Sequence, residues 1–112
     1  MDPYPILLGG VKKQTGETIT VRFPYTGEVY TQVCQATTND LRAAVAAACD
    51  GYEKTRVMTS HERSQVLARL ADAIHARADE LAEVLVMEGG KTRKFAAAEV
   101  ARAEVTVRTT AE

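Results

Sequence analysis

The spacing of apolar residues changes once along this chain, near residue 36, and the change restricts the folds that the chain can adopt. Before this point, apolar and polar residues alternate with a period of two, which is typical of half-buried strands. After it, apolar residues recur at every third or fourth position, which is typical of amphipathic helices. The chain has 112 residues, enough for one small domain. The pattern therefore predicts an α+β fold in which a strand region, residues 1–36, precedes a helical region, residues 37–112.

The strand region contains one clear hairpin pattern. Residues 18–23 and 29–33 alternate, and the segment 24–28 between them has a proline and a glycine at turn spacing. A shorter apolar run, residues 6–8, ends at the turn pair Gly9-Gly10. We expect a short antiparallel hairpin preceded by a short strand. Because an isolated hairpin is marginally stable in water, this one should pack on a helix or extend the sheet of another chain.

The helical region divides into three predicted helices. Thr37 followed by Asp40, and Thr59 followed by Glu62, fit the start signal in which a hydroxyl and a carboxylate satisfy free backbone N–H groups. Gly89-Gly90 then supplies the left-handed backbone that ends a helix. The first apolar stripe consists of Leu41, Ala44, Val45, Ala48 and Tyr52. The second, in one long helix, consists of Val66, Leu67, Leu70, Ile74, Ala78, Leu81 and Leu85. The third, after Lys91, consists of Phe95, Ala98, Ala101 and Val105.

Composition argues against several classes of partner. The formal net charge is −1, so no basic excess favours nucleic acid. The apolar runs are far shorter than the roughly 20 residues of a membrane span. The amino terminus lacks the pattern of a secretory signal, and we expect a cytoplasmic protein. The apolar content comes mainly from Ala, Val and Leu, and a helix face this rich in alanine could form half of an interface.

The cysteines and histidines match no site pattern. Cys34 falls in a strand-like segment and Cys49 in a helix-like one. We expect two reduced, half-buried thiols rather than a disulfide, and a buried structural role for Cys49. His61 and His75 are 14 residues apart, which fits no metal-ligand spacing, and His61 is expected at the surface of a helix start.

The stretch Glu88-Gly89-Gly90-Lys91 allows three interpretations. Glu88 could be a general base beside flexible glycines, or Lys91 could supply charge to a loop that holds an anion. The spacing of a phosphate-binding loop is absent, and no strand precedes the stretch. The end of one helix and the start of the next explain all four residues, and we favour that interpretation. Asp79 and Glu80 are expected on a solvated helix face.

Five segments occur in a fixed order along nearly the whole chain. They are Pro24-Tyr25-Thr26-Gly27-Glu28; Ala36-Thr37-Thr38-Asn39-Asp40 followed by Ala44-Val45-Ala46-Ala47-Ala48; Arg63, Leu67, Ala71, Asp72 and Ile74; Glu88-Gly89-Gly90-Lys91; and Ala98-Glu99-Val100-Ala101-Arg102. Their order and spacing resemble the amino-terminal region of the aldehyde dehydrogenase superfamily. The turn and the third helix look closest to the branch that acts on lactaldehyde, phosphonoacetaldehyde and small semialdehydes. The resemblance implies a single partial domain, residues 1–112, of that family's Rossmann-like α/β fold, preceding the cofactor-binding core.

The resemblance also implies an activity for a longer parent, a homo-oligomer that transfers hydride from a thiohemiacetal to NAD or NADP through a cysteine nucleophile and a glutamate base. In the family these groups lie beyond this chain's end, and Cys34, Cys49 and Glu88 do not match their motifs. We therefore assign no catalytic, cofactor-binding or metal-binding residue here. Glu99, which aligns near a monovalent-cation site of some members, is not assigned one either.

The chain alone is predicted to be inactive and to supply packing and subunit contacts. Its expected partners are the rest of the parent subunit or a second copy, reached through the apolar helix faces and the hairpin edge. The alternative is a stand-alone helical interaction module derived from the family. Such a module should end in a cap and a polar tail, whereas residues 109–112 stop within the helical pattern, which favours a piece of an enzyme.

Overall fold

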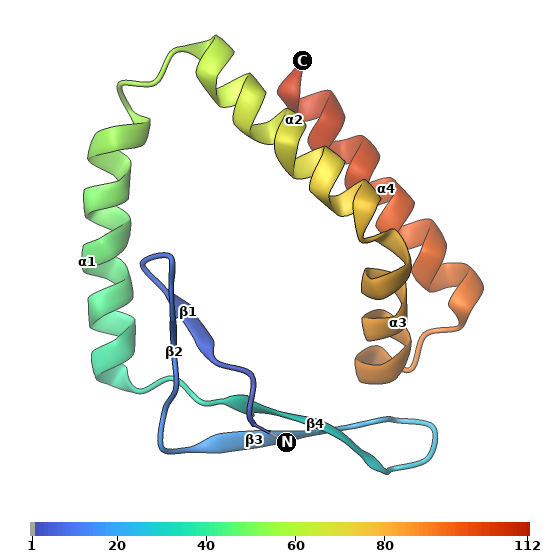
Figure 1. The fold of residues 1–112 in the computed structure, drawn as a ribbon. Coiled ribbons are helices and arrows are strands. Elements are labelled where there is room, and N and C mark those ends of the chain that lie inside the picture. Colours follow the sequence, from blue (N-terminus) through green and yellow to red (C-terminus); the bar gives the residue numbers. More distant parts are fainter. Residues whose placement is uncertain (1) are drawn as a thin grey trace. The chain divides into compact units, whose positions relative to one another are not determined.

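The computed structural model describes residues 2–112, which divide into two compact units. The first unit comprises the residues up to Arg22 together with Gly27–Val57, and the second comprises Phe23–Thr26 together with Met58–Glu112. Within the described residues, strands precede helices, and the fold is α+β as predicted (Figure 1). The elements are β1 (Ile6–Leu8), β2 (Val11–Lys13), β3 (Thr18–Arg22), β4 (Val29–Cys34), α1 (Thr38–Thr55), α2 (Ser60–Ala76), α3 (Ala78–Gly89) and α4 (Arg93–Ala111).

The first unit contains two hairpins where the sequence predicted one hairpin and a single strand. β1 pairs with β2 in an antiparallel arrangement, and β3 pairs with β4 in a second sheet. Gly9 and Gly10, at φ 58° and 81°, make the tight turn between β1 and β2. Two consecutive positive φ angles suit glycine because it has no Cβ. β2 escaped prediction because Val11 is its single apolar residue and the whole strand is exposed.

The β3–β4 hairpin is the one predicted from the alternation of residues 18–23 and 29–33. Ile19 faces Val33 and Val21 faces Thr31 in an antiparallel register that shifts between Val21 and Arg22. Tyr4 adds a parallel bridge to the outer edge of β4, donating its backbone N–H to Gln32 at 2.8 Å. Part of that edge is therefore already paired.

Helix α1 begins at the predicted capping box. The Thr37 hydroxyl accepts the backbone N–H of Asp40, whose carboxylate accepts the backbone N–H of Thr37. The helix turns its smallest side chains inward, and a Cβ added at Gly9, next to β1, would lie 3.4 Å from that of Ala47. The half-buried face consists of Ala44, Ala47 and Gly51. The predicted stripe is therefore partly wrong as a buried face, because its large members, Leu41, Val45 and Tyr52, are exposed.

In the second unit, the chain forms two helices where one long helix was predicted, so that residues 2–112 contain four helices. The interruption lies at Arg77, whose φ of −115° and ψ of 20° leave the helical region. Its backbone N–H donates to Ile74 at 3.2 Å, which tightens the last turn of α2. Asp79 and Glu80 then stand in the first turn of α3, where carboxylates suit the helix dipole. No proline or glycine marks this break, and both resulting helices pack on α4.

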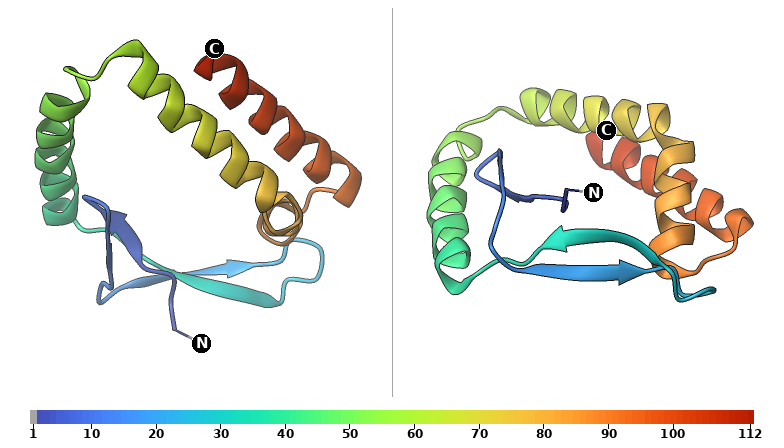
Figure 2. Two further views of the ribbon diagram at one scale, coloured as in Figure 1. Left: turned by 45° about the horizontal axis from the view of Figure 1, so that its top comes forward. Right: turned by 60° about the horizontal axis from the view of Figure 1, so that its bottom comes forward.

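Helices α2 and α4 lie side by side and antiparallel, as both views of Figure 2 show. The buried side chains of these two helices are small, since Ala71 of α2 and Ala96 of α4 are completely buried and Val100 of α4 is 6% exposed. Small residues let two helix backbones approach closely. The predicted apolar stripe of α2 is therefore also partly wrong as a buried face, because Val66 and Leu70 are 45% and 47% exposed.

Candidate functional site

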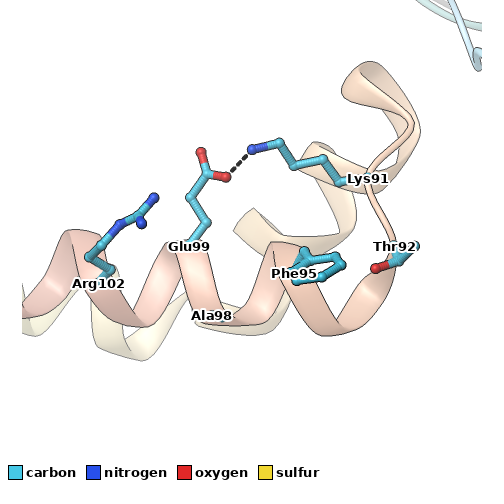
Figure 3. Close-up of a pocket in the computed structure, with 6 residues that line it drawn as sticks. All are labelled: Lys91, Thr92, Phe95, Ala98, Glu99 and Arg102. Carbon is cyan, nitrogen blue, oxygen red and sulfur yellow. Dashed lines mark hydrogen bonds and ion pairs between the residues drawn. The ribbon is translucent and has the colours of Figure 1, made fainter.

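The stretch Glu88–Lys91 connects α3 to α4 and borders an open hollow in the second unit. Gly89 is the last residue of α3, and Gly90 caps it in the left-handed conformation at φ 66°, with its N–H donating to Val86 at 3.0 Å. The hollow, of about 380 Å³, is lined by Lys91, Thr92, Phe95, Ala98, Glu99 and Arg102 (Figure 3). The backbone of this stretch therefore ends α3, as the preferred interpretation of the sequence predicted.

Lys91 reaches across this hollow to Glu99 on α4 (Figure 3). The hydrogen bond from the Lys91 ammonium, then its charge, lowers the pKa of Glu99, and burial opposes this. Glu99 is therefore a carboxylate at neutral pH, and it neutralises the lysine beside it. A neutralised lysine is a poor anchor for an anion, and a carboxylate whose pKa is lowered by an ion pair is a weaker general base. The pair fastens the loop to α4 and shows no feature of a reactive site.

Gly90 also lies next to Pro24, a residue of another of the segments described above. A Cβ added at Gly90 would lie 3.2 Å from the Cβ and 3.3 Å from the Cγ of Pro24. Pro24, from the turn 23–26, belongs to the same compact unit as α3. Pro24 therefore lies close to the left-handed cap of α3, where glycine leaves room for it.

The two cysteines are free and have different surroundings. Cys34 is buried, donates to the Gln14 side-chain oxygen at 2.8 Å and accepts the backbone N–H of Thr15 at 3.5 Å. Cys49 is exposed, so its predicted burial is wrong. The reason is the orientation of α1, which turns its alanine and glycine face, and not the flank that carries Cys49, toward β1.

The histidines lie on the surface of the second unit. His61 is exposed, as predicted, at the second position of α2. His75 on α2 pairs with Glu104 on α4 at 3.0 Å, and Arg108 bridges Glu104 at 3.0 Å and Asp72 at 3.1 Å. Hydrogen bonds from His75 and then Arg108 lower the pKa of Glu104. This charged row links α2 to α4.

The remaining carboxylates singled out in the sequence are also at the surface. Asp79 and Glu80 are exposed. Arg77 donates twice to Glu80, at 2.8 and 2.6 Å, and this lowers the pKa of Glu80. Among residues 2–112, no three His, Cys, Asp or Glu side chains are grouped closely enough to hold a metal ion. No helix in the same range is long and apolar enough to cross a membrane.

One polar cluster in the first unit was not anticipated. Lys13 at the end of β2 donates to the Asp40 carboxylate at 2.5 Å, and Asp40 is 4% exposed. The hydrogen bond from Lys13, followed by those from Thr37, lowers the pKa of Asp40 to about 2. Sequence reasoning missed the pair because Lys13 was not placed in a strand. The turn Gly9-Gly10 directly before it was the available signal. The cluster joins the start of a helix to a hairpin.

The order of segments described in the sequence analysis also occurs in known proteins. The model of the aldehyde dehydrogenase family matches residues 11–112. The chain is 34% identical over 109 residues to a 3-sulfolactaldehyde dehydrogenase of Priestia aryabhattai, covering 97% of this chain and 22% of that protein. It is 39% identical over 82 residues to a D-glyceraldehyde dehydrogenase (NADP(+)) of Picrophilus torridus, covering 73% of this chain and 17% of that protein.

The fold agrees with the sequence comparison. The NADP-dependent glyceraldehyde-3-phosphate dehydrogenase of Bacillus halodurans C-125, solved with NADP, superposes with a TM-score of 0.94 at 26% identity. The superposition covers 99% of this chain and 24% of that one. The chain thus spans about a quarter or less of the relatives it matches. With the family model matching nearly its whole length, the chain belongs to the aldehyde dehydrogenase family.

Proposed function

We propose that this chain is the amino-terminal part of an NAD(P)+-dependent aldehyde dehydrogenase that oxidises a small aldehyde to its acid. The observation that carries the proposal is the family match over residues 11–112, at 22% coverage of a full-length relative. Two relatives are named for sulfolactaldehyde and glyceraldehyde, both short aldehydes with polar substituents. These names support the small hydroxyaldehyde branch for the parent of this chain.

The cofactor does not fit the residues present here, and we assign it to the rest of the parent. A dinucleotide is held by a glycine-rich turn that leads from a parallel strand into a helix. The described strands form only antiparallel two-stranded sheets, and Gly89-Gly90 follows a helix. The nucleophile and the base belong to the same remainder under this proposal, so the chain alone is expected to show no turnover.

The role proposed for the chain itself is packing, as one partial domain of a larger cytoplasmic homo-oligomer. Large apolar side chains on three helices support this role, since Leu41, Leu70 and Phe95 are 63%, 47% and 68% exposed. An isolated domain rarely leaves this much apolar helix surface in water, because burying it is favourable. These faces are the proposed contact surfaces for further polypeptide.

The test is an NAD(P)+ reduction assay with a panel of short aldehydes, on this chain and on the product of the uninterrupted gene. We expect no reduction by the chain and aldehyde-dependent reduction by a longer product. Intact mass identifies which product is present. A native product of this length that is inactive would instead support the stand-alone interaction module.

A further inference from the structure

Residues 3–5 lie along the edge of β4 that faces away from β3. Tyr4 donates its backbone N–H to the carbonyl of Gln32, and its own carbonyl accepts the backbone N–H of Cys34, both at 2.8 Å. These two hydrogen bonds make Tyr4 the parallel bridge partner of Val33. The Tyr4 side chain is 67% exposed, so the backbone and not the ring makes this contact.

The residues on either side of Tyr4 are both prolines. In an extended segment, the backbone N–H groups of successive residues point to opposite sides. Because the N–H of Tyr4 points to β4, positions 3 and 5 are those whose N–H groups would point away from it. Proline has no N–H. The outward side of Pro3-Tyr4-Pro5, which we call the edge strap, therefore offers no backbone donor to a further strand.

Gln14, which follows β2, holds the edge strap with its side chain. Its Nε2 donates to the Pro3 carbonyl at 3.1 Å, and its Oε1 accepts from the buried Cys34 thiol at 2.8 Å. One amide group thus joins the strap to the last residue of β4. The strap is therefore held by a side-chain contact as well as by its two backbone hydrogen bonds.

The remainder of the β4 edge is interrupted within the strand itself. Val21 pairs with Thr31 and Arg22 pairs with Val29, so Tyr30 is the extra residue of a bulge. A bulge disrupts regular pairing and blunts a strand edge. The regular part of β4 is therefore residues 31–34, and this is the part that the edge strap occupies.

We propose that the edge strap prevents the outer edge of β4 from pairing with β4 of a second copy of this chain. An unpaired strand edge is a template for another chain, because its N–H and carbonyl groups lack partners. The strap binds the Gln32 carbonyl and the Cys34 N–H, which such a strand would otherwise bind, and its prolines end the sheet. A second copy can pair with this edge only after it displaces the strap. The β4 side of the hairpin is thereby closed to partners while the strap is seated.

Amide hydrogen exchange, followed by NMR on the full chain, tests whether the strap is seated. In the unaltered chain the backbone N–H of Cys34 should be protected. Tyr4→Pro removes the donor to Gln32, so the exchange of the Cys34 N–H should become faster by roughly fivefold, the effect of one backbone hydrogen bond. Tyr4→Ala is the matched control, because it keeps the N–H and changes only an exposed side chain.

Sedimentation equilibrium of the same two variants tests whether the strap prevents association. A β4–β4 dimer displaces two straps, so the association constant of Tyr4→Pro should exceed that of Tyr4→Ala by the square of the single factor, roughly 25-fold. Association through other surfaces is common to both variants and does not affect the ratio. Protection of the Cys34 N–H in Tyr4→Pro should return as the protein concentration rises, which would locate the new contact at β4.

Gln14→Glu is a second variant that leaves every backbone group of the strap and of β4 unchanged. It keeps an oxygen that accepts from the Cys34 thiol and loses the donor to the Pro3 carbonyl. We expect it to change both measurements in the same direction as Tyr4→Pro. It therefore tests the proposal even where a proline at position 4 disturbs the fold, and circular dichroism verifies the helices of each variant.

Three results would overturn the proposal. Fast exchange of the Cys34 N–H in the unaltered chain would show that the strap is not seated. Equal association of Tyr4→Pro, Gln14→Glu and Tyr4→Ala would show that it does not guard the edge. Stronger association without concentration-dependent protection of Cys34 would show that another surface carries it. The proposed function is tested separately, since it depends on NAD(P)+ reduction by the longer product.

Discussion

The two compact units stabilise their helices by different means. In the second unit, where α4 packs on both α2 and α3, the buried side chains are small and apolar, with Ala71 and Ala96 completely buried. In the first unit the buried side chains are Thr31, Cys34 and Asp40. Helix α1 packs on β1 through the small residues Ala44, Ala47 and Gly51, and its start is joined to β2 by the hydrogen bond from Lys13 to the buried Asp40. The comparison teaches that small residues make the close contacts of the helices in both units, and that the first unit adds a buried, charged hydrogen bond at the start of its helix. Steric changes should damage the second unit most, and acid should damage the first.

The largest effect is expected from overpacking the second unit. Ala96→Leu adds a branched side chain where no space remains, and it should lower the free energy of unfolding by about 2 kcal/mol. Urea denaturation followed by circular dichroism measures the loss. Ala101→Leu is the matched control, because Ala101 is exposed on the same helix and the change there should be near neutral. Equal losses for the two variants would mean that α4 is not closely packed around Ala96 in solution.

Acid should weaken the first unit through Asp40. The folded-state pKa of Asp40 is about 2, below its ordinary value of 3.8, so the carboxylate stabilises the fold above about pH 4. That contribution is lost as the pH falls through the folded pKa near 2, because protonation then removes the charge that Lys13 and Thr37 bind. Carboxyl NMR titration of Asp40 should give the low pKa directly.

The matched variants for this prediction are Lys13→Met and Lys12→Met. Removing Lys13 deletes the first cause of the low pKa, so the Asp40 pKa should rise and the acid loss should begin at higher pH. Lys12 is the neighbouring lysine on β2, and its replacement should leave the titration of Asp40 unchanged. If both variants behaved like the parent chain, the Lys13–Asp40 hydrogen bond would be absent in solution.

Much of the local structure could be predicted because it depends on residues a few positions apart. Thr37 with Asp40 and Thr59 with Glu62 form the capping boxes that their spacing indicated. The glycine pair after Glu88 ends α3 as expected. The break at Arg77 was missed because neither a proline nor a glycine causes it. Its physical origin is that both α2 and α3 pack on α4, which no local pattern records.

The orientation of α1 could not be predicted from periodicity. The helix has two apolar faces, and the amphipathic pattern favoured the larger side chains of Leu41 and Tyr52 as the buried ones. The structure buries the face of Ala44 and Ala47 instead, because a close approach to β1 requires small residues. The ion pair between Lys91 and Glu99 could not be predicted from local sequence patterns either. Whether these two side chains come close depends on the path of the connection between α3 and α4.

A smaller effect is expected at the end of α3. Gly90→Ala places a Cβ at a positive φ and 3.2 Å from Pro24, so it should lower the free energy of unfolding by about 1.5 kcal/mol. Gly89→Ala provides the contrast, because Gly89 is helical with open space around it and alanine favours the helix. We expect that variant to be slightly more stable. Thermal unfolding of the pair measures both signs, and a loss in both would contradict the assigned cap.

The smallest effects compare the two capping boxes, which have the same geometry in different surroundings. Thr59→Ala should cost about 0.5 kcal/mol, because Glu62 and the freed N–H groups are exposed and water can replace the hydroxyl. Thr37→Ala should cost about 1 kcal/mol, because Asp40 is buried and loses one of its hydrogen-bond donors. Urea denaturation of both variants gives the difference. A larger loss at Thr59 would show that the start of α2, and not the polar junction at α1, is the more sensitive to the loss of its cap.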